Sequence, residues 1–271
     1  MHVIYSTLVQ ELHSFAKAHQ FEKAVLGLSG GLDSAVALCI AIRAFGAKNV
    51  TALILPEMGT TPGDDIDHAK ILAEFFGCEV EYQPINNFLV DFHFVPWDQN
   101  EEAAQNLRAR MRATVLHHYS EVHNAMIIGT ANKSDLQLGF GQLDGAFTGH
   151  LHILGDLYKS DVIDLARALN LPPELVDGPY SRNLKFHQTD EEDLGASWNK
   201  IDDILQQLED KVEPDALIEK GMDALLVHKL IRLVHENEAL PKSVSTIHVG
   251  RISESIKNAQ KAEAESLRTY P

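Results

Sequence analysis

Short apolar runs alternate with longer amphipathic segments along the first half of the chain. Residues 24–28, 50–55 and 125–129 are apolar runs typical of buried strands, and residues 79–83 alternate between polar and apolar side chains. The segments between them repeat apolar residues every three or four positions, as amphipathic helices do. We expect helices, in chain order, around Leu8, Leu12 and Phe15, over Asp33–Phe45, over Ile66–Phe76 and over Ala103–Tyr119, with Leu107, Met111 and Val115 as the buried stripe of the last.

This alternation predicts an α/β fold with a parallel sheet that helices cover on both faces. Ligands bind such sheets at the carboxyl ends of the strands. The glycine-rich loop after the first strand and Gly129-Thr130 after the fourth should therefore lie at the same edge. We expect the functional site at that edge.

The second half of the chain is less regular. Residues 130–156 contain five glycines with little periodicity, and residues 177–195 are polar, so both stretches are predicted as loops. Ser160 is expected to N-cap a helix that runs to Leu169. Two further amphipathic helices are expected, one through Trp198, Ile201, Leu205 and Leu208 and one over Met222–Val234. We interpret residues 1–271 as one domain with a core over roughly 20–235 and a helical C-terminal tail.

Charge narrows the classes of partner. The 271 residues include 39 Asp and Glu against 23 Lys and Arg, a formal net charge of −16. Such a surface repels nucleic-acid backbones, so a polynucleotide substrate is not expected, and an anionic substrate would need a local group of Arg and Lys. Two cysteines without a nucleophile's context, no basic-then-apolar leader and no long apolar run favour a cytoplasmic protein without membrane contact.

The loop between the first strand and its helix has the composition of a phosphate cradle. Gly30 and Gly31 permit a tight turn, and the following helix N-terminus offers free amides to an anion. The loop lacks both the Gly-Lys-Ser/Thr of a P-loop and the dinucleotide fingerprint. Asp33 would repel a bare phosphate, so a divalent cation between the two would explain its presence. The alternative is an ordinary strand-turn-helix corner with Asp33 as a first-turn charge.

Ser29–Ser34 match the pyrophosphate loop of the N-type ATP pyrophosphatases, and within that group the chain resembles the ammonia-dependent NAD synthetases. The resemblance implies a Rossmann-like, three-layer α/β/α fold of the adenine nucleotide alpha hydrolase type. It also implies ATP and Mg²⁺, deamido-NAD and ammonia as substrates, and a homodimer. The implied ATP-binding residues of the loop are Gly27, Leu28, Ser29, Gly30, Gly31, Leu32, Asp33 and Ser34.

Three further motifs carry the resemblance. Asn106–Arg112 is similar to the family's Asn-x-x-Ala-Arg-x-Arg, which implies that Arg110 binds deamido-NAD. Gly129–Asp135 looks like Gly-Thr-x-Asn-Lys-Ser-Glu, which implies that Thr130 contacts ATP and that Asp135 binds Mg²⁺ together with Asp33. Asp156–Ser160 resembles Asp-Leu-Tyr-Lys-Thr, which implies that Lys159 binds the ATP phosphates and acts with Asp33 in catalysis.

Weaker matches follow. The resemblance implies that Ser181 serves ATP and that His228 and Lys229 reach the substrate, and Gln188–Gly195 also fits the family pattern. Without the resemblance, each motif has a structural interpretation. The arginines would form a salt-bridged, solvated helix face, and the His-Lys pair would be ordinary surface residues. The 129–135 stretch would be a polar capping loop, and the 188–195 stretch would be a capping sequence that opens a helix.

Several positions depart from the family pattern, among them Asp135 for Glu, Ile153 for Pro and Leu230 for Arg, and four bear on the second substrate. Gln142 stands for Thr, Ala146 and Asn183 stand for Asp, and His150 stands where some members have a substrate-binding Asp. The ATP and Mg²⁺ positions are retained, whereas carboxylates facing the nicotinate half and the ammonia pocket are replaced. Two explanations remain open: an NAD synthetase with compensating changes, which we favour, or a paralogue that amidates another carboxylate such as nicotinate mononucleotide.

The implied reaction has two steps. The substrate carboxylate attacks the α-phosphorus of ATP to give an acyl adenylate and pyrophosphate, and ammonia then displaces AMP. With no catalytic cysteine and no length for an attached glutaminase domain, we expect nitrogen as free ammonia or from a separate glutaminase. A non-catalytic adenine-nucleotide-binding module is an alternative. A sulfur- or tRNA-directed pyrophosphatase is another, although the acidic charge and the missing cysteine pair argue against it.

Overall fold

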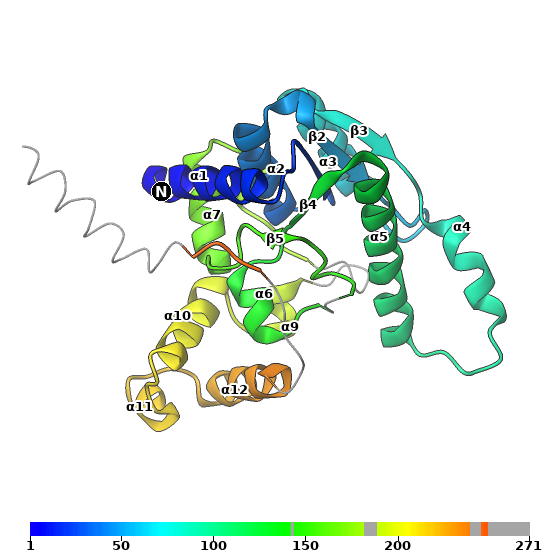
Figure 1. Ribbon diagram of the computed structural model, residues 1–271. Coiled ribbons are helices and arrows are strands. Elements are labelled where there is room, and N and C mark those ends of the chain that lie inside the picture. The colour runs from blue at the N-terminus through cyan, green and yellow to red at the C-terminus, as the bar shows by residue number, and fades with distance from the viewer. Residues whose placement is uncertain (142–143, 182–188, 239–244, 249–271) are drawn as a thin grey trace, which may run out of the picture.

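Five parallel strands form the centre of the structure. The computed structural model describes residues 1–141, 144–181, 189–238 and 245–248. The strands are β1 (Lys23–Gly27), β2 (Val50–Ile54), β3 (Glu79–Tyr82), β4 (Ala125–Gly129) and β5 (Leu151–His152). They lie in the order β3-β2-β1-β4-β5, and each pairs in parallel with its neighbours (Figure 1). The first four confirm the strands predicted from the apolar runs, within one residue at each end.

Helices connect the strands and extend the fold beyond them. The longer ones are α1 (His2–Ala18), α2 (Leu32–Phe45), α3 (Gly63–Phe76), α5 (Glu101–His123), α7 (Lys159–Ala168), α10 (Trp198–Glu209) and α12 (Ala224–Glu238). The short ones are α4 (Asn86–Leu89), α6 (Lys133–Leu138), α8 (Pro173–Val176), α9 (Asp190–Leu194) and α11 (Pro214–Glu219), with the 3₁₀ turns η1 (Ala47–Asn49) and η2 (Val90–Phe94). No helix in the described ranges is long and apolar enough to span a membrane.

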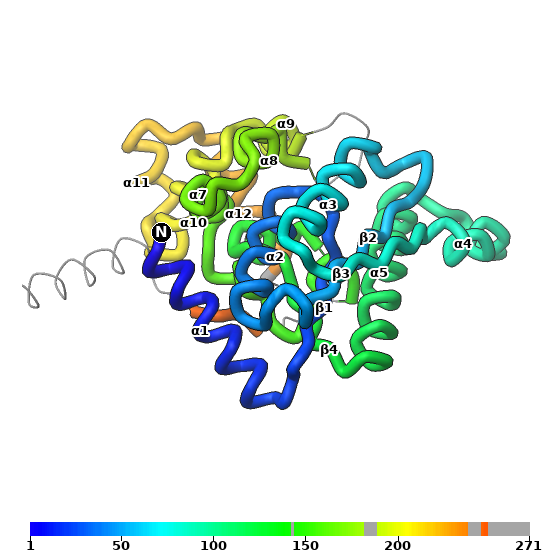
Figure 2. The backbone as a smooth tube through the Cα atoms, turned by 90° about the horizontal axis from the view of Figure 1, so that it is seen from above, coloured from blue at the N-terminus to red at the C-terminus, as the bar shows by residue number. Residues whose placement is uncertain are grey.

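Alternate residues of the central strands enter two separate cores. In β1, Ala24 and Leu26 pack with α1 and α2, whereas Val25 faces α5 on the other side of the sheet (Figure 2). This period of two follows from the geometry of a strand, and helices on both faces explain why the strands are apolar throughout. The predicted three-layer α/β/α arrangement is confirmed.

The contact face of α5 is displaced from the predicted stripe. Ala113, Leu116 and Ser120 are its buried residues, while the predicted Leu107, Met111 and Val115 are only partly buried at the margin of the same core. The first half of α5 extends past the end of the sheet (Figure 1).

The predicted loop over residues 130–156 is wrong in two places, because it contains α6 and β5. Both elements are too short to show a period. Ser160 is not an N-cap, since α7 begins at Lys159 with Tyr158 before it, and the Tyr158 amide donates to the Asp161 carboxylate at 3.1 Å. The predicted loop over 177–195 likewise contains α9. Most of the predicted helical tail lies outside the described residues.

Candidate functional site

The glycine loop joins β1 to α2 at the carboxyl edge of the sheet, and its own serines hold its shape. The Ser34 hydroxyl donates to the Gly31 carbonyl at 2.9 Å, and the Gly31 amide donates to the Ser29 hydroxyl at 3.2 Å. Gly31 precedes α2 in extended conformation, and no described side chain caps that helix. An uncapped helix N-terminus beside a tight turn is suited to binding an anion.

Gly30 could not be replaced in this turn without strain. Its φ is +86°, and a Cβ at this position would lie 2.0 Å from the carbonyl oxygen of Asp65 in α3. The turn therefore packs directly against the backbone of α3. Only glycine allows both the conformation and the contact.

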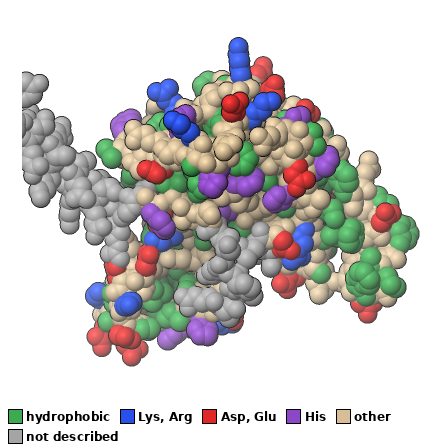
Figure 3. Space-filling model, viewed as in Figure 1, with side chains coloured by type: hydrophobic (Ala, Val, Ile, Leu, Met, Phe, Trp, Pro, Cys, Tyr) green, Lys and Arg blue, Asp and Glu red, His purple; other side chains and the backbone are tan. Residues whose placement is uncertain are grey.

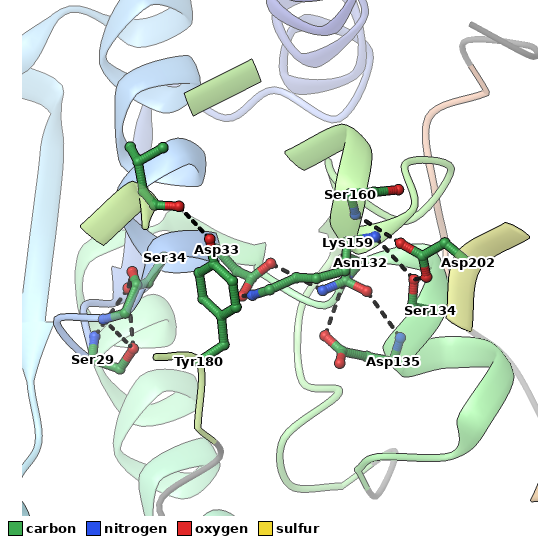
Figure 4. A network of polar contacts seen from close by, with 12 residues as sticks. Ser29, Asp33, Ser34, Asn132, Ser134, Asp135, Lys159, Ser160, Tyr180 and Asp202 are labelled. Atoms are coloured by element: carbon green, nitrogen blue, oxygen red, sulfur yellow. Dashed lines mark hydrogen bonds and ion pairs between the residues drawn. The ribbon is translucent and has the colours of Figure 1, made fainter. Parts of the chain in front are cut away.

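The predicted residues Asp33, Asp135 and Lys159 come together around Asn132, and we call these four residues the Asp33 cluster (Figure 4). The Asn132 amide nitrogen donates to Asp33 Oδ1 at 2.9 Å, and its oxygen accepts the Asp135 backbone N–H at 2.9 Å. The Lys159 ammonium forms an ion pair with Asp33 Oδ2. The cluster thus collects the first turns of α2, α6 and α7.

Burial and charge shift the pKa values of Asp135 and Lys159 in the Asp33 cluster. Loss of hydration is the largest influence on Asp135, and with the nearby charge of Asp33 it raises the Asp135 pKa to about 7. Burial lowers the pKa of Lys159, but the charges of Asp33, Asp135 and Asp190 together outweigh it, so this pKa is raised and the lysine stays a cation. Carboxylates crowded around one ammonium favour a further cation.

The donor set of this cluster fits magnesium. Asp33 and Asp135 supply carboxylate oxygens, which Mg²⁺ prefers, and each charge acts on the other. In the described part of the chain, no three His, Cys, Asp or Glu residues are grouped to hold a metal alone. Magnesium commonly takes only one or two protein carboxylates and completes its shell with phosphate oxygens and water.

Tyr180 and Asp190 join the site although no sequence pattern singled out their roles. The Lys159 ammonium lies 4.7 Å from the centre of the Tyr180 ring, and the Asp190 amide donates to the Tyr180 carbonyl at 2.9 Å. Asp190 is buried at the start of α9 and acts on the charges of both Asp135 and Lys159. The capping sequence before α9, Thr189 with Glu192, is confirmed as a capping box.

The three arginines of α5 have different partners. Arg108 pairs with Glu57 at 2.7 Å, and Arg112 donates to the Leu55 carbonyl at 2.9 Å, so both bind the segment that follows β2. Arg110 pairs with Asp144 at 2.9 Å on a more exposed part of the helix. The salt-bridge interpretation thus accounts for Arg108, and Arg110 has a weak surface partner that a substrate could displace.

The remaining predicted site residues are Thr130, Ser181, His228 and Lys229. Thr130 directly follows β4 and is partly buried, and Ser181 is exposed. Lys229 donates to the Leu194 carbonyl at 3.2 Å and to the Asp193 carbonyl, so it caps the C-terminus of α9, while His228 is exposed. Among the described contacts, none joins His228 or Lys229 to the Asp33 cluster.

Of the four departures from the family pattern, Gln142 and Asn183 lie outside the described residues, and Ala146 is exposed. His150 accepts the Ile127 amide at 2.8 Å through Nδ1, and its ring lies against that of Phe21. Burial, with His117 and His19 nearby, lowers its pKa. His150 therefore completes the edge of β4.

His152 is a buried residue of the site that the sequence pattern did not reveal. Its Nδ1 accepts the Ala131 amide at 3.2 Å, and its Nε2 donates to the Phe147 carbonyl at 3.0 Å. A Cβ on Gly129 would lie 2.5 Å from the ring, so the ring packs on bare backbone. His152 thus supports the turn from β4 into the Asp33 cluster.

Comparisons with known proteins agree with this arrangement. Residues 4–241 match the family described as NAD synthase. The NH₃-dependent NAD⁺ synthetase of Chlorobaculum tepidum is 33% identical over 237 residues, which cover 87% of this chain and 85% of the relative. Two solved structures have a TM-score of 0.75 at 28% identity: NMN synthetase from Francisella tularensis, which covers 89% of this chain and 96% of its own, and NH₃-dependent NAD synthetase from Campylobacter jejuni, with 90% and 99%.

The family match spans most of the chain and includes every element that contributes to the Asp33 cluster. The chain therefore belongs to the NAD synthase family and is a ligase.

Proposed function

We propose that this protein completes NAD synthesis by ATP-dependent amidation of deamido-NAD with ammonia. The substrate carboxylate attacks the α-phosphorus of ATP, which forms an acyl adenylate and releases pyrophosphate. Ammonia then attacks the acyl carbon, AMP leaves, and one proton is lost from nitrogen as the amide forms. The observation that carries this proposal is the Asp33 cluster, in which Asp33, at the start of the helix behind the glycine loop, pairs with Lys159 at the start of α7.

In this proposal the chain acts by positioning and by charge neutralisation. Amides of residues 27–34 and the Lys159 ammonium bind the ATP phosphates, with Thr130 and Ser181 as further ATP contacts. Asp33 and Asp135 would hold Mg²⁺, which would supply positive charge against that of the departing pyrophosphate. Lys159 already lies against Asp33, so it needs only a small movement to bind a phosphate oxygen there.

The second substrate is assigned to the α5 side of the site. Arg110 exchanges its exposed partner Asp144 for the anionic deamido-NAD, and His228 and Lys229 are kept as weaker substrate contacts. We further propose a cytoplasmic homodimer that takes nitrogen as free ammonia or from a separate glutaminase.

The test measures products with the purified full chain. With ATP, Mg²⁺, ammonium and deamido-NAD, we expect AMP, pyrophosphate and NAD in equal amounts. Asp33→Asn should lower the rate by roughly a hundredfold or more, because it removes charge stabilisation in the transition state. Asp203→Asn, an exposed change of equal charge on α10, is the matched control. Undiminished magnesium-dependent ATP consumption by Asp33→Asn would contradict the proposal.

Amidation of nicotinate mononucleotide is the second candidate. The solved structure from Francisella tularensis is described as NMN synthetase, and it resembles this chain as closely as the Campylobacter jejuni NAD synthetase does. Ala146, where the family pattern has Asp, also directly follows Gly145, at which a Cβ would lie 3.2 Å from Ala109 and 3.5 Å from the Arg110 nitrogen on α5. A kcat/KM for nicotinate mononucleotide above that for deamido-NAD would favour this candidate. ATP binding without AMP release from either acid would favour a non-catalytic module.

A further inference from the structure

Asp202 is a buried carboxylate outside the Asp33 cluster that contacts two of the cluster's three helices, α6 and α7 (Figure 4). It lies on α10 and is only 4% exposed. Its Oδ1 accepts the hydroxyl of Ser134, in α6, at 2.7 Å. Its Oδ2 accepts the backbone amide of Ser160, in α7, at 2.7 Å. One charged group therefore joins three helices.

The Ser134 hydroxyl extends this link to the backbone of Lys159. It accepts the Lys159 amide at 2.9 Å while it donates to Asp202. Asp202 thus holds the two amides that begin α7, one directly and one through Ser134. Ser134 is fully buried and immediately precedes Asp135. The backbone positions of Lys159 and Asp135 are consequently tied to the same carboxylate.

These contacts are of the strong kind. Hydrogen bonds to an ionised acceptor are shorter than neutral ones, and an anion is favoured at a helix N-terminus. Burial raises the pKa of Asp202, while the hydrogen bonds from Ser134 and Ser160 oppose that effect. The two hydrogen bonds fix the Asp202 carboxylate between Ser134 of α6 and the start of α7.

We propose that Asp202 is a positioning residue. It holds α7 against α6 so that Lys159 and Asp135 can bind the same magnesium–ATP complex. The inference rests on the proposed ATP chemistry. If Asp202 served only as a helix cap, its loss would lower the melting temperature and leave the turnover of folded protein unchanged. A positioning role requires that turnover and magnesium dependence change as well.

The first variant is Asp202→Asn. The amide oxygen can still accept from Ser134, but the NH₂ group meets the donating amide of Ser160, so one of the two bonds is lost. Asp203→Asn removes the same charge from the next, exposed residue of α10 and is the control. Below the melting temperatures of both, we expect kcat/KM for ATP to fall about 10- to 100-fold in Asp202→Asn only. The Mg²⁺ concentration for half-maximal rate should rise with it.

Equal kcat/KM for ATP and equal magnesium dependence in Asp202→Asn and Asp203→Asn would overturn the inference. If Asp202→Asn does not fold, Ser134→Ala decides, because it cuts the link to the Lys159 amide and keeps the bond to Ser160. For Ser134→Ala we expect a smaller loss of kcat/KM for ATP than for Asp202→Asn, again with a higher Mg²⁺ concentration for half-maximal rate. Wild-type behaviour in Ser134→Ala would count against the inference.

Failure of the proposed function would be visible separately, in the wild type. If the wild type releases no AMP with either acid, calorimetric binding of Mg²⁺–ATP to wild type, Asp202→Asn and Asp203→Asn replaces turnover as the measurement. Weaker binding in Asp202→Asn alone supports the positioning role, and equal binding in all three refutes it.

Discussion

The side-chain amide of Asn132 forms hydrogen bonds through both of its polar atoms. Its nitrogen donates to Asp33, and its oxygen accepts from the backbone amide of Asp135. Asp33 was predictable from the glycine-rich loop after the first strand, whereas Asp135 and Lys159 were predicted through the motifs shared with the family. Their distant contacts were not predictable, since Asn132 meets Asp33, and Tyr180 meets Lys159, only through the folding of separate segments. Tyr180 in particular reaches Lys159 by a ring contact that no local spacing encodes.

Asp161 gives a residue-scale prediction about pH. Burial raises its pKa to about 6, so folding favours its protonated form. The corresponding stability is fully present below the unfolded pKa of about 4 and is lost as the pH rises through about 6. Asp161→Asn keeps an acceptor for the Tyr158 amide and removes the charge. It should increase the free energy of unfolding by about 1–3 kcal/mol at pH 7.5 and by little at pH 4.

Urea denaturation at several pH values measures this difference. Asp203→Asn, which is exposed, should match the wild type at each pH. If Asp161→Asn increased the free energy of unfolding by the same amount at pH 4 and pH 7.5, burial of the charge would not be the cause of the increase.

At the scale of elements, the long strands and helices were predictable and the short ones were not. β5 contains two residues and α6 contains six, too few for a period to appear. Distant residues stabilise them instead: the Asn237 amide donates to the carbonyls of Leu136 and Gln137 at the end of α6. The path of the chain through the site could therefore not be predicted in detail, because the connection from β4 to α7 contains these short elements.

The contact between the glycine loop and α3 gives a prediction at this scale. Gly30→Ala combines a left-handed φ with a Cβ only 2.0 Å from the Asp65 carbonyl, so the loop or α3 must shift. We expect a loss of about 2–4 kcal/mol in the free energy of unfolding.

Gly31→Ala is the matched control in the same loop. Gly31 has extended backbone, and an added Cβ would first meet the Ser29 hydroxyl at 3.4 Å. Chemical denaturation should show a loss of less than about 1 kcal/mol. Equal losses for the two variants would indicate that the loop does not rest on α3.

For the whole molecule, residues 86–97 form an arm that carries α4 and η2 away from the sheet (Figure 1). Phe94 is 81% exposed and Trp97 65%, and apolar side chains are visible on this projecting part (Figure 3). Exposed apolar groups in such a cluster are typical of a protein interface. They support the proposed homodimer, with the arm as part of the contact.

The double variant Phe94→Asp with Trp97→Asp should therefore be a monomer, which size-exclusion chromatography with light scattering can measure. Phe75→Asp, a change to an equally exposed aromatic residue on α3, should leave the mass at that of the wild type. A wild type that is monomeric at micromolar concentration, or a double variant that stays dimeric, would exclude the arm as the interface.

The order of the strands has a consequence for how the protein is made. The partners of Asp33 are Asn132 and Lys159, which lie 99 and 126 residues further along the chain. A growing polypeptide that has left the ribosome as far as β4 already contains the whole glycine loop, but neither of those partners. Each nascent chain therefore contains its first acid well before the lysine that neutralises it, and the Asp33 cluster can form only after Lys159 has left the ribosome.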